Sequence, residues 1–365
     1  MNLKKWRLND VRYQEFKEMT LSRSWVKDTA AEGHFIFLPK NLTDNLTDVK
    51  PWNIMCEITL FWKDLPSMKE KIERLKKEKH AVILAHYYAP EEVQQVADFV
   101  GDSYALAKAA KETSAEVLVF CGVEFMGESA KLLNPQKTVL MPSYTADCPM
   151  AHMVQEEKIA ELRKQYPDLA VVCYINSTAR LKALSDVCVT SSNAVKIVKR
   201  MESQNIFFIP DRNLGAFVKA QIPEKNIILN DGCCPIHAAI TEQQVREAKQ
   251  AHPNAIVLAH PECEPNVLAL ADRIGSTSEI LAWAEGEGEE FLIVTEEGVR
   301  FPLQNKNPKK QFYFPKPYPV CPGMKENTMQ RLCAALESEK VGVEIAEDLR
   351  KRALLPLERM LELAK

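Results

Sequence analysis

Apolar positions fall into short runs that alternate with amphipathic stretches from about residue 68 onward. The runs predict strands at residues 81–85, 99–100, 117–120, 138–141, 170–173, 187–189, 206–209, 227–229, 255–258, 273–274, 291–294 and 311–314. The stretches between them show helical spacing of apolar residues. Strands that are apolar throughout and alternate with helices are typical of parallel sheets covered on both faces. We therefore expect an α/β protein.

The predicted elements recur in three copies. Asp98, Asp186 and Asp272 begin matching segments and lie 88 and 86 residues apart. Each copy carries an imidazole or phenol twelve residues before this aspartate, a hydroxyl five residues after it, and a Cys-Pro pair 48 to 50 residues after it. These residues are His86, Tyr174 and His260; Ser103, Ser191 and Thr277; and Cys148, Cys234 and Cys321. Such self-similarity indicates repeated structural units.

The repeat predicts three homologous three-layer αβα units with parallel sheets, arranged about a pseudo-threefold axis. The units cover residues 66–148, 149–234 and 235–321. Because ligands of open α/β sheets bind beyond the carboxyl ends of strands, the shared residues should converge on one site. Residues 1–65 have no counterpart in the repeat, and we expect a poorly ordered extension or an upstream misassigned start. We expect residues 322–365 to form helices that pack back on the first unit.

Composition and charge narrow the class of protein. A chain of 365 residues fits two or three domains, and a net charge of −3 with interspersed signs gives no electrostatic footprint for nucleic acid. No apolar run approaches the roughly 20 residues of a membrane span, and the N-terminus lacks the apolar segment of a signal peptide. We therefore expect a cytoplasmic protein without nucleic-acid or membrane partners. In that compartment ten cysteines favour metal ligands over a disulfide framework.

The three cysteines of the Cys-Pro pairs favour an iron–sulfur centre. Their wide spacing does not match the close cysteine pairs of a zinc ribbon or the cysteine run of a ferredoxin. One thiolate from each unit, Cys148, Cys234 and Cys321, matches a [4Fe–4S] cluster held at three corners, with the fourth iron open to act as a Lewis acid. The alternative is three buried loop cysteines, and the shared period favours ligands. Cys233 and Cys263 have no equivalents and are not counted among the ligands.

Ten short motifs follow one another between residues 85 and 328. They are Ala-His-Tyr-Tyr (85–88), Asp-Phe-Val-Gly-Asp-Ser (98–103), Cys-Pro-Met-Ala (148–151), Tyr-Ile-Asn-Ser-Thr (174–178), Thr-Ser-Ser-Asn-Ala (190–194), Pro-Asp-Arg-Asn-Leu-Gly (210–215), Cys-Pro-Ile-His (234–237), His-Pro-Glu-Cys (260–263), Gly-Ser-Thr (275–277) and Met-Lys-Glu-Asn-Thr (324–328). In this order they resemble the quinolinate synthase family over about residues 68–365. The resemblance implies the same threefold α/β architecture around a [4Fe–4S] cluster bound by the three cysteines.

The resemblance also implies a reaction and its residues. The family condenses iminosuccinate with dihydroxyacetone phosphate to quinolinate, losing phosphate and water, in de novo NAD biosynthesis. Because iminosuccinate is short-lived in water, transient handover from the oxidase that produces it is a further expected interaction. The implied substrate-binding residues are His86, Ser103, Tyr174, Asn176, Ser191, His260, Glu262 and Thr277. We expect Glu262 to be the principal general acid/base, with His260 and the phenols of Tyr88 and Tyr174 assisting the loss of hydroxide.

Several alternatives stay open. The three repeated aspartates suit turns as well as substrate contacts, Ser103 and Ser191 suit helix caps, and His152, His237 and His252 lack equivalents in all units and are expected to be surface or packing residues. An iron–sulfur hydro-lyase of the aconitase type would share the open iron. A solute-binding α/β protein could hold a dicarboxylate with the strand-end hydroxyls and would need no thiolates.

Overall fold

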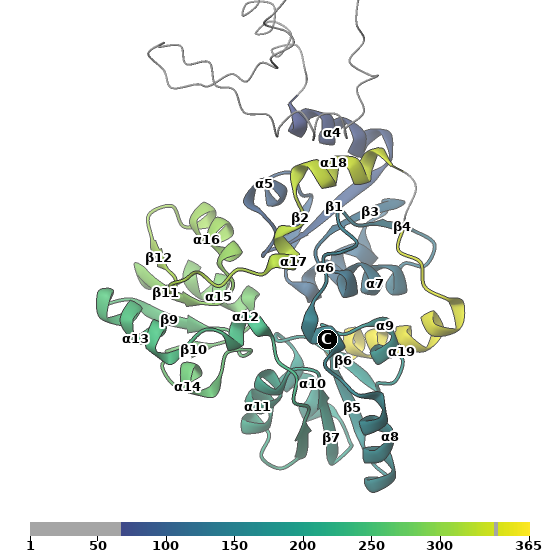
Figure 1. Ribbon diagram of the computed structural model, residues 1–365, viewed down its shortest axis with the longest axis vertical. Coiled ribbons are helices and arrows are strands. Elements are labelled where there is room, and N and C mark those ends of the chain that lie inside the picture. The colour runs from purple at the N-terminus through teal and green to yellow at the C-terminus, as the bar shows by residue number, and fades with distance from the viewer. Residues whose placement is uncertain (1–66, 339–341) are drawn as a thin grey trace, which may run out of the picture. The chain divides into compact units, whose positions relative to one another are not determined.

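The computed structural model describes residues 67–338 and 342–365 (Figure 1). The prediction for residues 1–65 lies outside the described residues. Within the described part, strands form three four-stranded sheets. The first contains β1 (Ala81–His86), β2 (Phe99–Gly101), β3 (Val117–Cys121) and β4 (Thr138–Leu140); the second β5 (Ala170–Tyr174), β6 (Val187–Val189), β7 (Asn205–Ile209) and β8 (Asn226–Leu229); the third β9 (Ile256–Ala259), β10 (Arg273–Ile274), β11 (Glu290–Val294) and β12 (Gln311–Tyr313).

All neighbouring strands are parallel, and the three sheets share one strand order. The orders are β2-β1-β3-β4, β6-β5-β7-β8 and β10-β9-β11-β12. The α/β class and the three repeated parallel sheets are therefore confirmed. The pseudo-threefold axis stays a prediction.

Helices connect the strands and follow them at the C-terminus. They are α4 (Met68–Glu78), α5 (Glu91–Gln94), α6 (Ser103–Glu112), α7 (Glu124–Leu133), η2 (Pro149–His152), α8 (Glu156–Gln165), α9 (Ala179–Lys182), α10 (Ala194–Arg200), α11 (Arg212–Gln221), α12 (Pro235–Ala238), α13 (Glu242–Ala251), α14 (Pro265–Leu268), α15 (Thr277–Glu285), η3 (Glu297–Val299), α16 (Arg300–Lys306), α17 (Pro322–Lys325), α18 (Met329–Glu337) and α19 (Glu347–Leu363). No helix among these described residues is both long and apolar enough to cross a membrane.

The inner strands β1, β3, β5, β7, β9 and β11 are buried on both faces, which explains why they are apolar throughout. On β1, Leu84 belongs to the core that contains Leu106 of α6, whereas its neighbour Ile83 belongs to a second core with Ile72 of α4 and Leu332 of α18. Successive side chains on a strand point to opposite faces, so each face has its own core. Full burial of such an aliphatic side chain contributes about 1.5–3 kcal/mol relative to exposure.

The three repeated aspartates hold the backbone of their own units. Each carboxylate accepts a hydrogen bond from a backbone N–H in the first strand of its unit, fifteen residues earlier. The bonds run from Ile83 to Asp98 at 2.7 Å, from Val171 to Asp186 at 2.7 Å and from Val257 to Asp272 at 2.8 Å. The aspartates therefore fix the turn before the second strand, and none of them is among the residues that line the pocket described below.

The two long C-terminal helices pack on different units. Helix α18 packs against α4 and β3 of the first unit, whereas α19 lies against α9 and β6 of the second unit and also against α7 of the first (Figure 1). Side chains of α10 reach the end of α19: Lys196 Nζ donates to Ala364 O at 2.6 Å and Arg200 donates to Leu363 O at 2.5 Å. Cations stabilise the negative end of a helix dipole. Helix α19 thus contacts the second unit as well as α7 of the first.

Candidate functional site

The shared strand order places a switch point between the first and third strands of each sheet. Ligands of open α/β sheets bind at the carboxyl ends of such strands. A pocket of about 670 Å³, including open solvent at its mouth, lies at these strand ends and is lined by all three units. Its lining includes every residue predicted for the site: His86, Tyr88, Ser103, Cys148, Tyr174, Asn176, Ser191, Cys234, His260, Glu262, Thr277 and Cys321.

In each unit, the end of the first strand contributes two residues to this lining. One is the last residue of the strand or the residue just after it, and the other lies two positions further along the chain. The pairs are His86 with Tyr88, Tyr174 with Asn176, and His260 with Glu262. The repeat therefore delivers two pocket-facing side chains per unit, and their chemistry differs from unit to unit.

The two histidines are held in the same way. Nδ1 of His86 accepts the backbone N–H of Tyr88 at 3.1 Å, and Nδ1 of His260 accepts that of Glu262 at 3.3 Å. With Nδ1 acting as the acceptor, a neutral ring carries its proton on Nε2. Burial lowers the pKa of each histidine to about 3, so both rings are neutral at pH 7. Each ring therefore has an Nε2–H donor, and Nε2 of His260 lies 3.3 Å from the hydroxyl of Ser191.

The repeated hydroxyls are not helix caps. Asp102 and Ser276 are the N-caps of α6 and α15, and the side chain of each accepts a backbone N–H three residues further on. Ser103 and Thr277 are the first residues of these helices, and Ser191 lies two residues before the N-cap of α10. The capping alternative for Ser103 and Ser191 is therefore wrong. Their hydroxyls face a pocket where helix N-termini favour anions.

Each cysteine of a Cys-Pro pair is the N-cap of a short helix. Cys148 precedes η2, Cys234 precedes α12 and Cys321 precedes α17, with proline at the first helical position. Proline suits this position because its fixed φ is helical and its missing N–H would have no helical partner. The repeated Cys-Pro pair thus has a local reason: the chain turns into a helix immediately after a thiol at the pocket.

A carboxylate holds the backbone N–H of each of these cysteines. The acceptors are Asp147 for Cys148 at 2.7 Å, Asp211 for Cys234 at 2.9 Å and Glu296 for Cys321 at 3.0 Å. Asp211 and Glu296 occupy matching places, two residues after the ends of β7 and β11, and both are fully buried. Each also accepts an N–H at a helix start with its second oxygen, from Leu214 and Gly298 respectively, at 2.7 Å.

The surroundings of the three thiols oppose their ionisation. Burial, followed by the nearby Cys321, raises the pKa of Cys148 to about 12. Burial and the charge of Glu262 raise the pKa of Cys234 well above its usual value, and burial raises that of Cys321. Buried thiolates that repel one another require a compensating cation. The donor set therefore fits a metal or an iron–sulfur group, which binds thiolates.

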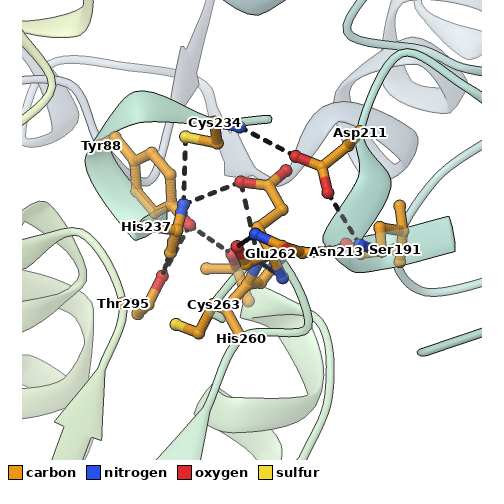
Figure 2. A network of polar contacts seen from close by, with 12 residues as sticks. Tyr88, Ser191, Asp211, Asn213, Cys234, His237, His260, Glu262, Cys263 and Thr295 are labelled. Carbon is orange, nitrogen blue, oxygen red and sulfur yellow. Dashed lines mark hydrogen bonds and ion pairs between the residues drawn. The ribbon is translucent and has the colours of Figure 1, made fainter. Parts of the chain in front are cut away.

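Glu262 lies at the centre of a buried polar network (Figure 2). The hydroxyl of Tyr174 donates to its Oε1 at 2.6 Å, and Nδ1 of His237 lies 2.7 Å from its Oε2. Burial alone would raise the pKa of the Glu262 carboxyl, but the two hydrogen bonds and the neighbouring His237 and His260 lower it below its usual value. Burial also raises the pKa of Tyr88 and Tyr174. The network thus pairs an ionised carboxylate with protonated phenols.

His237 belongs to this network, so its assignment as a surface or packing residue is wrong. The side chain is buried, and Nδ1 also lies 3.2 Å from Sγ of Cys234. Cys234, His237 and Glu262 present three ligand-type atoms within 4.8 Å of one another. The clue in the sequence was the motif Cys-Pro-Ile-His, which places His237 one helical turn after a predicted ligand. Thr295, Asp211 and Glu296 were also missed. Asp211 and Glu296 are matching carboxylates, but the first unit has Val123 at that place, and the residues that match Thr295 are Gly122 and Pro210.

Comparison with known proteins gives one consistent result. A family model described as Quinolinate synthetase A protein matches residues 70–362. The quinolinate synthase of Caldicellulosiruptor saccharolyticus is 49% identical over 302 residues, which are 82% of this chain and 100% of the relative. That of Caldicellulosiruptor bescii is 51% identical over 297 residues, 81% of this chain and 98% of the relative, and that of Aquifex aeolicus 45% over 307 residues, 82% and 95%. The chain therefore belongs to the quinolinate synthase family of enzymes, which its ten motifs predicted.

Proposed function

We propose that this protein is a quinolinate synthase that condenses iminosuccinate with dihydroxyacetone phosphate for de novo NAD biosynthesis. One phosphate and two waters leave for each quinolinate formed. The observation that carries the proposal is the meeting of all twelve residues predicted from the sequence around one pocket, with contributions from all three units.

The three cysteines support a [4Fe–4S] cluster as the resident cofactor. Cys148, Cys234 and Cys321 line the same pocket, each from a different unit, and all are free thiols. When bound, the cluster supplies one iron atom without a protein ligand, which acts as a Lewis acid. Three cysteine ligands at matching positions leave that iron open, as the proposed chemistry requires.

Neutral donors hold the anionic substrates. No lysine or arginine is among the described residues that line the pocket. Carboxylates and phosphate must therefore be bound by the hydroxyls of Ser103, Ser191 and Thr277, by backbone N–H groups at the starts of α6 and α15, and by Nε2–H of His86 and His260. Several neutral donors bind an anion while leaving its charge available to the reaction.

Proton transfers fall to the network around Glu262. Its ionised carboxylate is ready to accept a proton from the carbon or nitrogen that reacts, and the phenols of Tyr88 and Tyr174 keep their protons at neutral pH. A hydroxide leaves more readily when an acid protonates it. We therefore assign Glu262 as the principal acid/base, with Tyr88, Tyr174 and His260 as its partners.

Anaerobic purification and a product assay test the function. The expected result is a brown protein with about four irons and four sulfides per chain, as a [4Fe–4S] cluster contains, that forms quinolinate from the two substrates. A colourless, iron-free protein that binds a dicarboxylate would instead support a solute-binding role. Hydration of a simple alkene acid without condensation would support a hydro-lyase of the aconitase type.

The supply of iminosuccinate is part of the proposal. Because this imine hydrolyses in water, we expect transient handover from an oxidase that produces it. Quinolinate yield should therefore be higher when the oxidase is present than when the same amount of imine is added after a delay. Equal yields after a delay of several imine lifetimes would exclude this dependence on fresh supply.

A further inference from the structure

Lys182 is a fully buried lysine without an assigned role. It is the last residue of α9 in the second unit, and none of its side chain is exposed to solvent. Its amine forms a hydrogen bond with a backbone carbonyl and no ion pair with a carboxylate of the described residues. Burying a cation costs free energy unless an opposite charge compensates it. Packing alone therefore does not explain a lysine at this place.

The amine of Lys182 contacts the wall of the pocket from behind at two points. Nζ donates to Ser177 O, and Ser177 directly follows Asn176, which lines the pocket. Nζ also lies 5.5 Å from the ring centre of Phe125, another lining residue. Phe125 belongs to α7 of the first unit, and α7 packs against α9 (Figure 1). The amine thus lies directly behind the wall, where the first and second units meet.

The loop between β5 and α9 leaves the side chain of Asn176 available to a ligand. Backbone N–H of Ser177 donates back to Ile175 O at 2.8 Å, and the amine of Lys182 holds the carbonyl of the same serine. Oδ1 of Asn176 is buried and has no hydrogen-bond partner among the described residues. A buried acceptor of this kind in a pocket-lining residue is placed to receive a donor group of a ligand. Lys182 therefore supports a loop that presents a binding residue.

Two thiols also interact electrostatically with Lys182. Cys173 and Cys188 occupy paired positions on β5 and β6, and both are fully buried. Burial raises the pKa of the Cys173 thiol, but the hydrogen bond with Cys188 and the positive charge of Lys182 outweigh burial and bring it to about 7. At slightly acidic pH this thiol is mostly protonated. The charge of Lys182 is then left without a full counter-charge, and an anion in the pocket can compensate it.

We propose that Lys182 is a positioning residue whose buried charge makes the pocket prefer dicarboxylates to monocarboxylates. It acts across Asn176 and Phe125 and contacts no ligand itself, while neutral donors inside the pocket make the hydrogen bonds. Coulomb energy is proportional to the ligand charge and is weakly screened in a buried region, so a dianion gains about twice as much as a monoanion of the same shape. The inference rests on the proposed function, since it concerns how the dicarboxylate substrate is held.

Succinate and its monoamide, succinamate, measure this preference, because they share length and shape and differ by one charge. Isothermal titration calorimetry on the anaerobically purified protein gives Kd for each ligand at about pH 6.5, where carboxylates are ionised and the Cys173 thiol is mostly protonated. Lys182→Met keeps a similar length without the charge. We expect Kd to rise about tenfold for succinate and about threefold for succinamate, since the factor for one charge is squared for two.

Two further variants separate the charge from other effects. Lys182→Gln has a shorter, neutral side chain that retains an N–H donor, and it should lose the same preference as Lys182→Met. Lys225→Met is the matched control in the same unit. Lys225 is half-buried, its Nζ donates to Met201 O at 2.7 Å and to Ser203 O at 2.8 Å, and it does not line the pocket. Its substitution should leave both Kd values unchanged.

The ratio of the two Kd values decides the outcome. Equal weakening of succinate and succinamate in both Lys182 variants would mean that the side chain only holds the loop, and this would overturn the proposal. Unchanged Kd values would overturn it as well. An unsubstituted protein that shows the expected ratio but forms no quinolinate would support the charge behind the pocket and contradict the proposed function.

Discussion

The ends of the third strands differ between the first unit and the other two. After β7 and β11 stand the buried carboxylates Asp211 and Glu296, each bonded to the N–H of its unit's cysteine. The matching residue after β3 is Val123, which is apolar and caps no helix with its side chain, and Asp147 beside Cys148 provides the acceptor instead. All three units thus pair the backbone N–H of their cysteine with a carboxylate. In the first unit, however, this carboxylate comes from a different position in the sequence than in the other two.

A second difference lies at the ends of the first strands and concerns chemistry. The second pocket-lining residue at the end of each first strand is Tyr88 in the first unit, Asn176 in the second and Glu262 in the third. Only the third unit contributes a carboxylate here, and that carboxylate receives hydrogen bonds from the second unit and from α12. Matching positions therefore share a place in the pocket and differ in function.

The largest expected effect comes from removing the carboxylate of Glu262, which the other two units lack at the matching position. Glu262→Gln keeps the shape of the side chain but removes the proton acceptor, so kcat should fall by about 10²- to 10⁴-fold, the usual range for a general acid/base. Quinolinate formation is the measurement, and iron content with visible absorbance is the control for the cofactor site. Asn176→Asp, the matching change in the second unit, should not restore turnover to this variant. Turnover near the unsubstituted rate in Glu262→Gln would remove the residue from its role.

The two ways of holding a cysteine can be compared by substitution. Asp211→Ser keeps an N-cap for α11 but is too short to reach Cys234 N as well, which leaves this N–H without its buried acceptor at a cost of about 1–3 kcal/mol. Asp147→Ser affects Cys148 from a more exposed position, its side chain being 43% exposed, where water can replace the lost acceptor. We expect Asp211→Ser to lower the free energy of unfolding more than Asp147→Ser does. We also expect the Asp211→Ser variant to retain less iron than the Asp147→Ser variant after treatment with a chelator. Equal losses would mean that burial of the carboxylate has no influence.

The smallest predicted effect concerns the connection between the first and third cysteine segments. Glu326, five residues after Cys321, accepts from the hydroxyls of Ser143 and Thr145 at 2.6 and 2.7 Å and from Arg331 at 2.6 Å. The hydroxyls, followed by Arg331, lower the pKa of Glu326 to about 2. A depressed carboxyl pKa stabilises the fold above the unfolded-state pKa, and the contribution is lost as pH falls through the folded-state value.

Glu326→Gln should therefore be less stable than the unsubstituted protein at pH 6, and the difference should shrink as the pH falls from about 4.5 towards 2. Denaturant unfolding at several pH values measures it. A difference that stays constant over this range would show that the charge of Glu326 contributes nothing. Glu202→Gln is a suitable control, since Glu202 is exposed and takes no part in the hydrogen bonds of Glu326.

The repeat was sufficient to predict nine of the twelve candidate residues that line the pocket, because it fixes positions at strand ends. Residues such as Ser103, Ser191 and Thr277 share a hydroxyl and a spacing, so they were visible in the sequence. His237 and Thr295 could not be found in this way, because their importance comes from contacts with Glu262 and Tyr88 that are remote in sequence. The position of α19 was also not predictable, since an amphipathic helix fits any exposed apolar face.

The hydrogen bonds of the three repeated aspartates, Asp98, Asp186 and Asp272, bear on the order in which parts of the protein fold. Each of these bonds joins residues fifteen positions apart within one unit, whereas the bonds of the network join residues as far apart as Tyr88 and Thr295, separated by 207 positions. Closing a short loop costs less entropy than closing a long one, so local contacts form first. Each unit can therefore establish its own strand crossover before the three meet. We therefore expect the pocket to be assembled last and its amides to be the first to exchange with solvent deuterium when the native protein opens.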